Sequence, residues 1–218
     1  MSIHDTEDQL FLTWQERYNH FVKDGAVDER AYLSSSLKIL FLLKEVSDPE
    51  GGWDLRELLR SNIPSQTWNN IARWTYGILN VPQFQPWAKI PSSSPSFRQE
   101  WLKNIVAVNI KKTGGRSVAD PAGILEFVSG SKDDLRRQLN LYAPSVTICC
   151  GTAEYLPHLF DQQEIGEWST SSNGTRYARS PVLGSIIHYF HPQVHYPANF
   201  LYTMLMGAVQ EVLSSSKR

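Results

Sequence analysis

The sequence predicts an α/β fold, a three-layer α/β/α sandwich with a central four-stranded parallel sheet. Four short apolar runs recur along the chain, and segments with helical spacing of apolar residues separate them. Almost every residue in these runs is apolar, which is typical of strands buried on both faces of a parallel sheet. The 218 residues suit one domain covering 1–218, in which residues 1–36 form an N-terminal helical extension.

Along the sequence, predicted helices precede and follow the first predicted strand. Leu10, Trp14 and Tyr18 share one face of a helix over residues 7–23, and Asp28 is suited to cap a short second helix. The elements that follow are a buried strand at 37–43, a polar loop at 44–52, helices at 53–60 and 65–79, and a proline-rich surface loop at 80–96. That last loop is longer than the usual connection, and such loops are often functional.

Three more strands are expected in the second half of the chain. The Asn173-Gly174 pair is a strong hairpin signal, and Pro192 stops the last strand because proline cannot continue a strand ladder. In order, the expected elements are a strand at 105–110, helices at 120–129 and 131–142, a strand at 146–150, a helix from 153, a hairpin within 167–183, a strand at 185–190 and a helix at 197–213.

Composition and charge narrow the class of protein. The formal net charge is −1, so basic residues that bind a nucleic acid would have to be a local group. Cys149 and Cys150 are adjacent and would point to opposite faces of a strand, so we expect both to be reduced and buried, as in a cytoplasmic protein. The acidic residues 1–8 differ from a signal peptide, and no apolar run reaches the ~20 residues that span a bilayer. We therefore expect no membrane contact. We also expect a monomer, although no residue pattern determines the oligomeric state.

Chemically capable side chains follow each predicted strand. The carboxyl ends of parallel strands meet at one edge of a sheet, where open α/β folds place their ligand sites. These ends carry the carboxylates Glu45 and Asp48, the amide Asn109, the basic residues Lys111, Lys112 and Arg116, and His191 before Pro192. We expect these groups to converge on one site.

Each of these residues also has a purely structural interpretation. Glu45 and Asp48 could be solvated loop residues, with Asp48-Pro49 starting a turn. Asn109 could serve a structural hydrogen bond, and His191 could be a packing histidine. The basic run after Asn109 could be a solvated loop.

Several common enzyme classes lack their motifs in this chain. The sequence has no phosphate-binding G-x-x-x-x-G-K-[ST] loop, no G-x-G-x-x-G after the first strand and no G-x-S-x-G elbow. His188, His191 and His195 suggest a metal, but 188–191 crosses a strand end and no acidic residue lies nearby in sequence. We therefore expect neither a metal nor a cofactor.

The strand ends resemble the uracil-DNA glycosylase superfamily. The first-strand motif would be residues 42–49, the strand ending in Asn and a basic, glycine-containing loop would be 108–116, and the closing His-Pro motif would be 191–197. Residues 150–153 are similar to the third strand and turn of that fold. The first motif departs from the family pattern, which has Gly before the acidic or amide residue and Pro-Gly or Pro-Tyr after it: here Lys44 precedes Glu45, and Pro49 follows Asp48. In the closing motif, Gln193 replaces the Ser of His-Pro-Ser.

The resemblance implies a role for each candidate. Asn109 would bind the edge of a pyrimidine, His191 would hydrogen-bond the carbonyl oxygen that gains negative charge as the base leaves, and Glu45 or Asp48 would orient a water. Trp53 is the first choice for stacking on the flipped base, although it could also be a core tryptophan at a helix start. The expected DNA contacts are Lys111, Lys112, Arg116, Gln193 and His195, with Arg176 and Arg179 on the hairpin.

The predicted function is therefore that of a monofunctional DNA glycosylase with DNA as its partner. It would hydrolyse the N-glycosidic bond of a flipped-out uracil, damaged or modified pyrimidine. The departures from the family pattern favour a different base, with hypermodified phage cytosine, and a role in antiviral defence, as one hypothesis. The alternative is a non-catalytic nucleotide-, DNA- or protein-binding module on the same fold.

Overall fold

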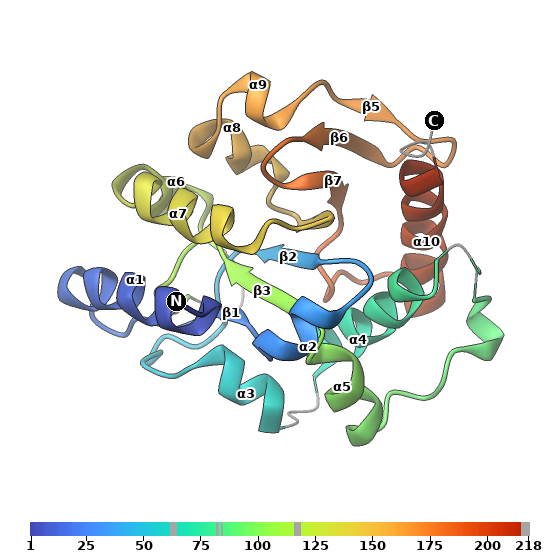
Figure 1. The fold of residues 1–218 in the computed structure, drawn as a ribbon, viewed down its shortest axis with the longest axis horizontal. Coiled ribbons are helices and arrows are strands. Elements are labelled where there is room, and N and C mark those ends of the chain that lie inside the picture. Colours follow the sequence, from blue (N-terminus) through green and yellow to red (C-terminus); the bar gives the residue numbers. More distant parts are fainter. Residues whose placement is uncertain (62–64, 82, 84, 116–118, 215–218) are drawn as a thin grey trace.

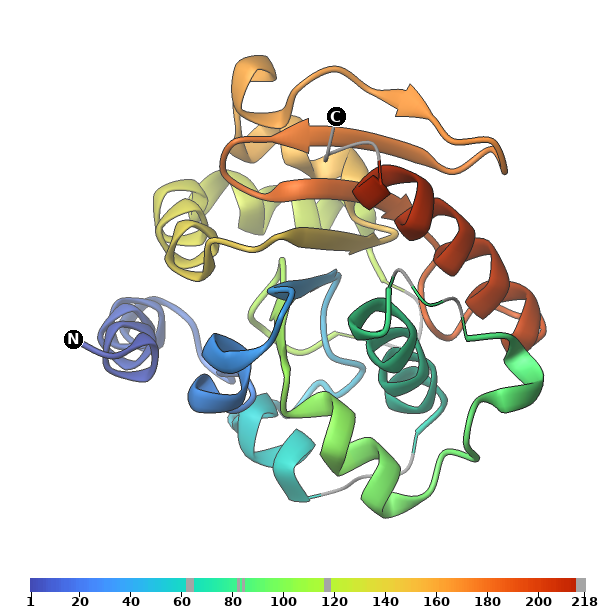
Figure 2. The ribbon, with the colours of Figure 1, turned by 45° about the vertical axis from the view of Figure 1, so that its right-hand side comes forward.

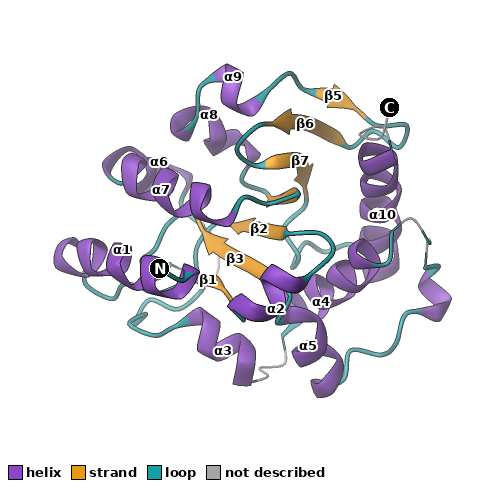
Figure 3. Cartoon of the chain, viewed as in Figure 1, coloured by secondary structure: helices purple, strands orange, loops and turns teal. Residues whose placement is uncertain are grey.

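The computed structural model is a mixed α/β fold and describes residues 1–61, 65–81, 83, 85–115 and 119–214. Its seven-stranded sheet has the order β1-β3-β2-β4-β7-β6-β5. Figure 3 shows the sheet extending from β1 near the centre to β5 at the upper edge, with helices on both sides of its central strands. The strands are β1 (Gly25–Ala26), β2 (Ile39–Leu43), β3 (Ile105–Asn109), β4 (Val146–Cys150), β5 (Ser169–Thr170), β6 (Arg176–Ser180) and β7 (Gly184–Tyr189).

The centre of the sheet contains the four strands that the sequence predicts. β2 runs parallel to both β3 and β4, with Leu43 opposite Asn109, and β4 runs parallel to β7. The expectation of a four-stranded, wholly parallel sheet is incomplete, because antiparallel strands extend it on both sides. β1 pairs with β3, while β6 and β5 continue beyond β7 (Figure 2). The hairpin thus joins the sheet by pairing with β7 instead of lying apart from it.

The helices match most of the predicted segments. They are α1 (Ile3–Arg17), α2 (Glu29–Ser34), α3 (Leu55–Ser61), α4 (Gln66–Leu79), α5 (Pro95–Leu102), α6 (Pro121–Gly130), α7 (Lys132–Tyr142), α8 (Leu156–Leu159), α9 (Gln162–Ile165) and α10 (Ala198–Ser214), with short 3₁₀ turns at Trp87–Lys89 and Ala153–Tyr155. Asp28 caps α2 as expected, through its side chain and the Ala31 N–H. The first helix ends at Arg17 rather than at 23, because His20 adopts a left-handed conformation and Phe21 bridges to Thr113. α5 was not predicted, although Ser94 caps it and Pro95 begins it.

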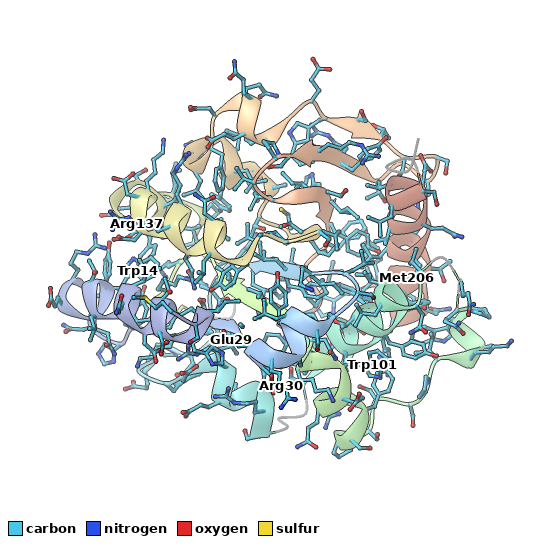
Figure 4. All side chains as sticks on the ribbon, viewed as in Figure 1. Trp14, Glu29, Arg30, Trp101, Arg137 and Met206 are labelled. Carbon is cyan, nitrogen blue, oxygen red and sulfur yellow. The ribbon has the colours of Figure 1, made fainter. Side chains whose placement is uncertain are left out.

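Alternating side chains of the central strands feed two hydrophobic clusters. Leu40 and Leu42 pack with residues of α1, α6, α7 and α8, whereas Ile39, Phe41 and Leu43 pack with residues of α3, α4, α5 and α10. Figure 1 shows α1, α6 and α7 on one side of the sheet and α4 and α10 on the other. Trp14 and Met206 mark these two sides (Figure 4). Within the part of the chain that the structure describes, no helix combines the length and apolar character needed to cross a membrane.

A buried ion pair joins the N-terminal region to the end of β3. The Lys112 ammonium donates to Asp24 Oδ1 over 2.7 Å, and both side chains are fully buried. The second Asp24 oxygen accepts the Asn109 backbone N–H over 2.7 Å, and Gln138 Nε2 of α7 also donates to Asp24 Oδ1 over 2.9 Å. Burial lowers the pKa of the Lys112 ammonium, and the Asp24 charge opposes that effect. Lys112 was expected to contact DNA; its charge is instead used inside the core and is not available to a phosphate.

We expect Lys112→Met to lower the free energy of unfolding by about 3–5 kcal/mol, because it leaves the Asp24 carboxylate buried without its counter-ion. Urea unfolding at neutral pH measures this change. Lys103→Met is the matched control: Lys103 pairs with Glu100 at the surface, so its loss should cost at most about 0.5 kcal/mol. Equal effects of the two substitutions would contradict the structural role of the buried pair.

Candidate functional site

A pocket of about 720 Å³ lies at the carboxyl ends of the parallel strands. It brings together seven of the predicted site residues, from three segments distant in sequence: Glu45, Asp48, Trp53, Asn109, His191, Gln193 and His195. The pocket also contains residues that the sequence analysis did not select: Leu43, Lys44, Val46, Ser47, Leu55, Leu58, Ser65, Gln66, Thr67, Trp68, Ala119 and Val194. The convergence follows from the parallel pairing, which places these strand ends side by side.

Asn109 contributes a buried amide to the pocket. Its side chain sits on the last residue of β3 and is only 3% exposed. The backbone N–H of Asn109 is held by Asp24, but its side-chain Nδ2 has no hydrogen-bond partner among the described residues. Leaving a buried donor unpaired costs about 1–3 kcal/mol, so the pocket carries an amide ready to donate to a ligand.

His191 is held in a defined tautomer. Its Nδ1 accepts a hydrogen bond from the backbone N–H of Gln193 over 3.2 Å, which leaves the proton of the neutral ring on Nε2. Burial and the nearby Lys44 charge lower the pKa of His191 below the ordinary value for histidine. At neutral pH the ring is therefore an uncharged Nε2–H donor at the pocket.

Asn70 of α4 positions the His-Pro loop. Its side chain is 2% exposed, and its Nδ2 donates to the carbonyl oxygen of Pro192 over 2.8 Å. This bond links the helix that packs on the sheet directly to the residue after His191. Sequence analysis missed Asn70, because a single amide within the apolar stripe of a helix does not reveal which distant backbone group it binds.

Asp48 is engaged in a turn and holds Trp53. Asp48 Oδ2 accepts the Trp53 indole N–H over 2.8 Å, and Oδ1 accepts the backbone N–H of Glu50 over 3.0 Å. The Trp53 hydrogen bond and the Glu50 backbone N–H lower the pKa of the Asp48 carboxyl. The turn interpretation of Asp48 is therefore correct, and the same carboxylate sets the position of a half-buried tryptophan at the pocket.

Glu45 is the other carboxylate of the first-strand loop. Its side chain is 4% exposed and forms an ion pair with the Lys111 ammonium. Gly115 lies directly against it: a Cβ at that position would come within 2.1 Å of the Glu45 carboxyl carbon. A side chain at position 115 would therefore have to displace the Glu45 carboxylate. At Gly114 a Cβ would come within 1.8 Å of the Asp48 backbone oxygen, so the close approach of this loop requires glycine there.

Lys44 adds a positive charge to the pocket. It occupies the position directly after β2 and lines the same cavity as His191. Within the described ranges, no acidic side chain pairs with the Lys44 ammonium. Lys44 therefore places a positive charge on the wall of the pocket.

Of the other predicted DNA contacts, Arg176 and Arg179 lie on β6, outside the pocket. Arg176 of β6 stacks over Trp168 at 5.1 Å, and Arg179 donates to the Val212 carbonyl oxygen over 2.9 Å. Lys112 is in the core, and Arg116 falls outside the described residues. Gln193 and His195 are exposed at the rim of the pocket.

Other reactive groups lie away from this site. Cys149 and Cys150 are free and fully buried, as expected, and burial raises the pKa of the Cys149 thiol to about 12. Within the residues that the structure describes, His, Cys, Asp and Glu side chains form no group of three or more that could hold a metal ion.

No protein-family model matches this sequence, and no curated protein matches it. Its chemistry must therefore be argued from the geometry of the pocket.

Replacing Lys44 should raise the pKa of His191, because Lys44→Met removes a positive charge that disfavours the protonated ring. The measurement is an NMR titration of the histidine ring signals, with His191 assigned by its loss in His191→Gln. The remote Lys103→Met should leave the titration unchanged, since Lys103 is an exposed partner of Glu100. A His191 pKa that stays the same or falls in Lys44→Met would show that the two side chains are not coupled.

Proposed function

We propose that this protein is a monofunctional DNA glycosylase that acts without a metal or cofactor on a flipped-out pyrimidine. One observation carries the proposal: a single pocket unites the unpaired buried amide of Asn109, the neutral Nε2–H donor of His191 and the carboxylate of Glu45. These groups supply recognition, leaving-group stabilisation and water activation, which are the three requirements of base excision.

The proposal includes a finer description of the fold, a three-layer α/β/α sandwich on four parallel strands. The parallel pairing of β3, β2, β4 and β7 and the two hydrophobic clusters support it. β1, β5 and β6 would be additions at the edges of that core. This is the arrangement that the resemblance to uracil-DNA glycosylases implies, in one domain.

Recognition would rest on Asn109 and an aromatic side chain. A carboxamide offers a donor and an acceptor side by side, which matches the paired polar atoms on the edge of a pyrimidine. Trp53, held by Asp48, supplies the ring for stacking. The pocket volume of about 720 Å³ is typical of sites that bind ligands of drug size, which leaves room for a substituent on the base. This room favours a damaged or hypermodified pyrimidine over plain uracil.

His191 would stabilise the departing base. As the bond between C1′ and the base nitrogen breaks, its electron pair passes to the base, and negative charge develops on the base carbonyl oxygen. A preorganised donor aimed at that oxygen is worth roughly 3–4 kcal/mol in comparable oxyanion sites. A neutral ring carries a single N–H, and the Gln193 contact to Nδ1 places that proton on Nε2, where it can be donated to the base.

Glu45 would orient the water that attacks C1′. The water oxygen forms the new bond to C1′, and its proton passes to the carboxylate while the base leaves as an anion that solvent protonates. Lys111 fixes the orientation of the Glu45 carboxylate. Asp48 is assigned the positioning of Trp53, because both of its oxygens already accept hydrogen bonds.

DNA would lie across the mouth of the pocket, with Gln193 and His195 at the rim and Lys111 on the loop after β3. Arg116, outside the described residues, stays a prediction from the sequence. Arg176 and Arg179 are further out on β6 and would meet only a longer stretch of DNA. A cytoplasmic monomer that acts in repair or in antiviral defence is consistent with this proposal.

A non-catalytic binding module on the same fold is the second candidate. One observation favours it: the Asp48 carboxylate is held in a turn and the Glu45 carboxylate is paired with Lys111. If neither group can activate water, the pocket would bind a nucleotide, DNA or protein without cleaving a bond. Salt-dependent DNA binding without base release would support this alternative.

Base release tests the proposal directly. We expect the purified chain to release a free base from DNA containing uracil, oxidised, hydroxymethylated or glucosylated pyrimidines, detected by mass spectrometry. His191→Ala should lower the rate on the order of 10²–10³-fold because it removes the donor to the leaving base. The matched control is His158→Ala, since His158 is an exposed histidine of α8 outside the pocket. No release from any of these substrates would refute the glycosylase proposal for these bases.

The two carboxylates should respond differently to neutral substitution. Glu45→Gln should lower the turnover rate on the order of 10²–10⁴-fold with little change in DNA affinity, because the water loses its general base. Asp48→Asn should mainly weaken substrate binding, since it disturbs the hydrogen bond that positions Trp53. Single-turnover rates and DNA affinities separate the effects. If Asp48→Asn lowered the turnover rate more than Glu45→Gln does, Asp48 rather than Glu45 would be the residue that activates water.

A further inference from the structure

Three exposed aromatic side chains form a continuous group beside the pocket. Phe190 is 41% exposed, Tyr196 48% and Phe200 42%. The Phe190 and Tyr196 ring centroids are 5.4 Å apart, and those of Tyr196 and Phe200 are 5.6 Å apart. We call these three residues the aromatic rim. The other exposed large apolar residues of the described chain are all aliphatic: Met1, Leu12, Leu33 and Leu125.

The aromatic rim is continuous with the candidate site. Phe190 directly precedes His191, and Tyr196 directly follows His195; both histidines line the pocket. The group is also held in place, because Phe200 lies in the first turn of α10 and the Tyr189 hydroxyl donates to the Leu201 carbonyl oxygen. A ligand that leaves the pocket at this side therefore meets fixed aromatic rings rather than a loose loop.

An aromatic side chain that packs in a core removes about 150–250 Å² of surface from water. Leaving three such rings exposed therefore forgoes a large stabilisation of the fold. Exposed apolar groups of this kind mark surfaces that bind a partner. The number of acidic residues in the segment that contains the rim bears on the charge of that partner. No Asp or Glu occurs between Trp168 and Gln210, although the chain contains 22 acidic residues in all. An anionic partner is therefore not repelled by any side chain of this segment.

We propose that the aromatic rim binds single-stranded DNA by stacking on the unpaired bases next to the nucleotide that enters the pocket. This inference rests on the proposed glycosylase function and defines its substrate class. Bases in a duplex are stacked on one another and hide their faces, whereas an unpaired strand can lay successive bases on exposed rings. The Lys44 charge at the pocket and the absence of Asp and Glu from the segment between Trp168 and Gln210 suit the phosphates of the same strand.

Fluorescence anisotropy with a labelled oligothymidylate and with its duplex tests the proposal. We expect tighter binding of the single strand, and Tyr196→Ala and Phe200→Ala each to weaken it about 5-fold or more, as expected for the loss of one stacked base. Phe200→Leu should weaken binding as much as Phe200→Ala, whereas Phe200→Trp should keep it, because only an aromatic face stacks. Leu125→Ala, at an exposed leucine of α6, is the control and should bind as the wild type does.

The following outcomes would overturn the inference. Binding of Phe200→Leu equal to that of the wild type would indicate a merely apolar contact, and a duplex bound more tightly than the single strand would exclude the substrate class. If sedimentation shows a dimer that Phe200→Ala dissociates while oligothymidylate affinity is unchanged, the rim is an interface between copies. Base release is measured separately. Aromatic-dependent single-strand binding without any base release would refute the glycosylase function alone, and base release with unchanged binding in Phe200→Ala would refute the rim alone.

Discussion

The buried Asp24 carboxylate is the interaction on which the geometry of the pocket depends. It accepts the Lys112 ammonium, the Asn109 backbone N–H and the Gln138 amide, and so ties the N-terminal region to β3, to the loop after it and to α7. The next two backbone N–H groups, of Ile110 and Lys111, donate to the carbonyl oxygens of Leu43 and Lys44 in β2 and the loop after it. The Asn109 N–H donates instead to the Asp24 carboxylate, which satisfies it. Without the carboxylate, the buried backbone N–H of Asn109 would be unpaired. The end of β3, which carries the Asn109 side chain, would then be held less firmly.

Hydrogen bonds already hold several groups of the pocket in one orientation or one tautomer. Gln193 fixes the tautomer of His191, Asn70 holds the carbonyl of Pro192, and Asp48 holds the indole of Trp53. Asn109 Nδ2 is the contrast, because it is buried and has no partner within the described residues. A site with fixed donors and one unsatisfied amide needs little reorganisation to bind a polar, planar ligand, which favours recognition by a few directed hydrogen bonds.

Much of the fold could be predicted because the central strands are apolar on both faces and separated by helical segments. Residues 39–43 and 146–150 were placed correctly for this reason. β1 was missed because two residues carry no periodicity, and its pairing with β3 exists only in the folded chain. The basic loop after Asn109 was predicted as one DNA-binding group. The structure divides it: Lys111 pairs with Glu45 and Lys112 with Asp24, partners that lie 66 and 88 residues away.

The sequence alone determined which side chains follow the strands, and therefore that Glu45, Asp48, Asn109 and His191 would meet at one edge of a parallel sheet. That inference needs only local patterns and the geometry common to parallel strands. Tertiary structure alone decided the state of the other groups: the unpaired amide of Asn109, the neutral ring of His191 and the ion pair between Glu45 and Lys111. These states depend on burial and on hydrogen-bond partners far away in the chain, and no local pattern of residues encodes either one.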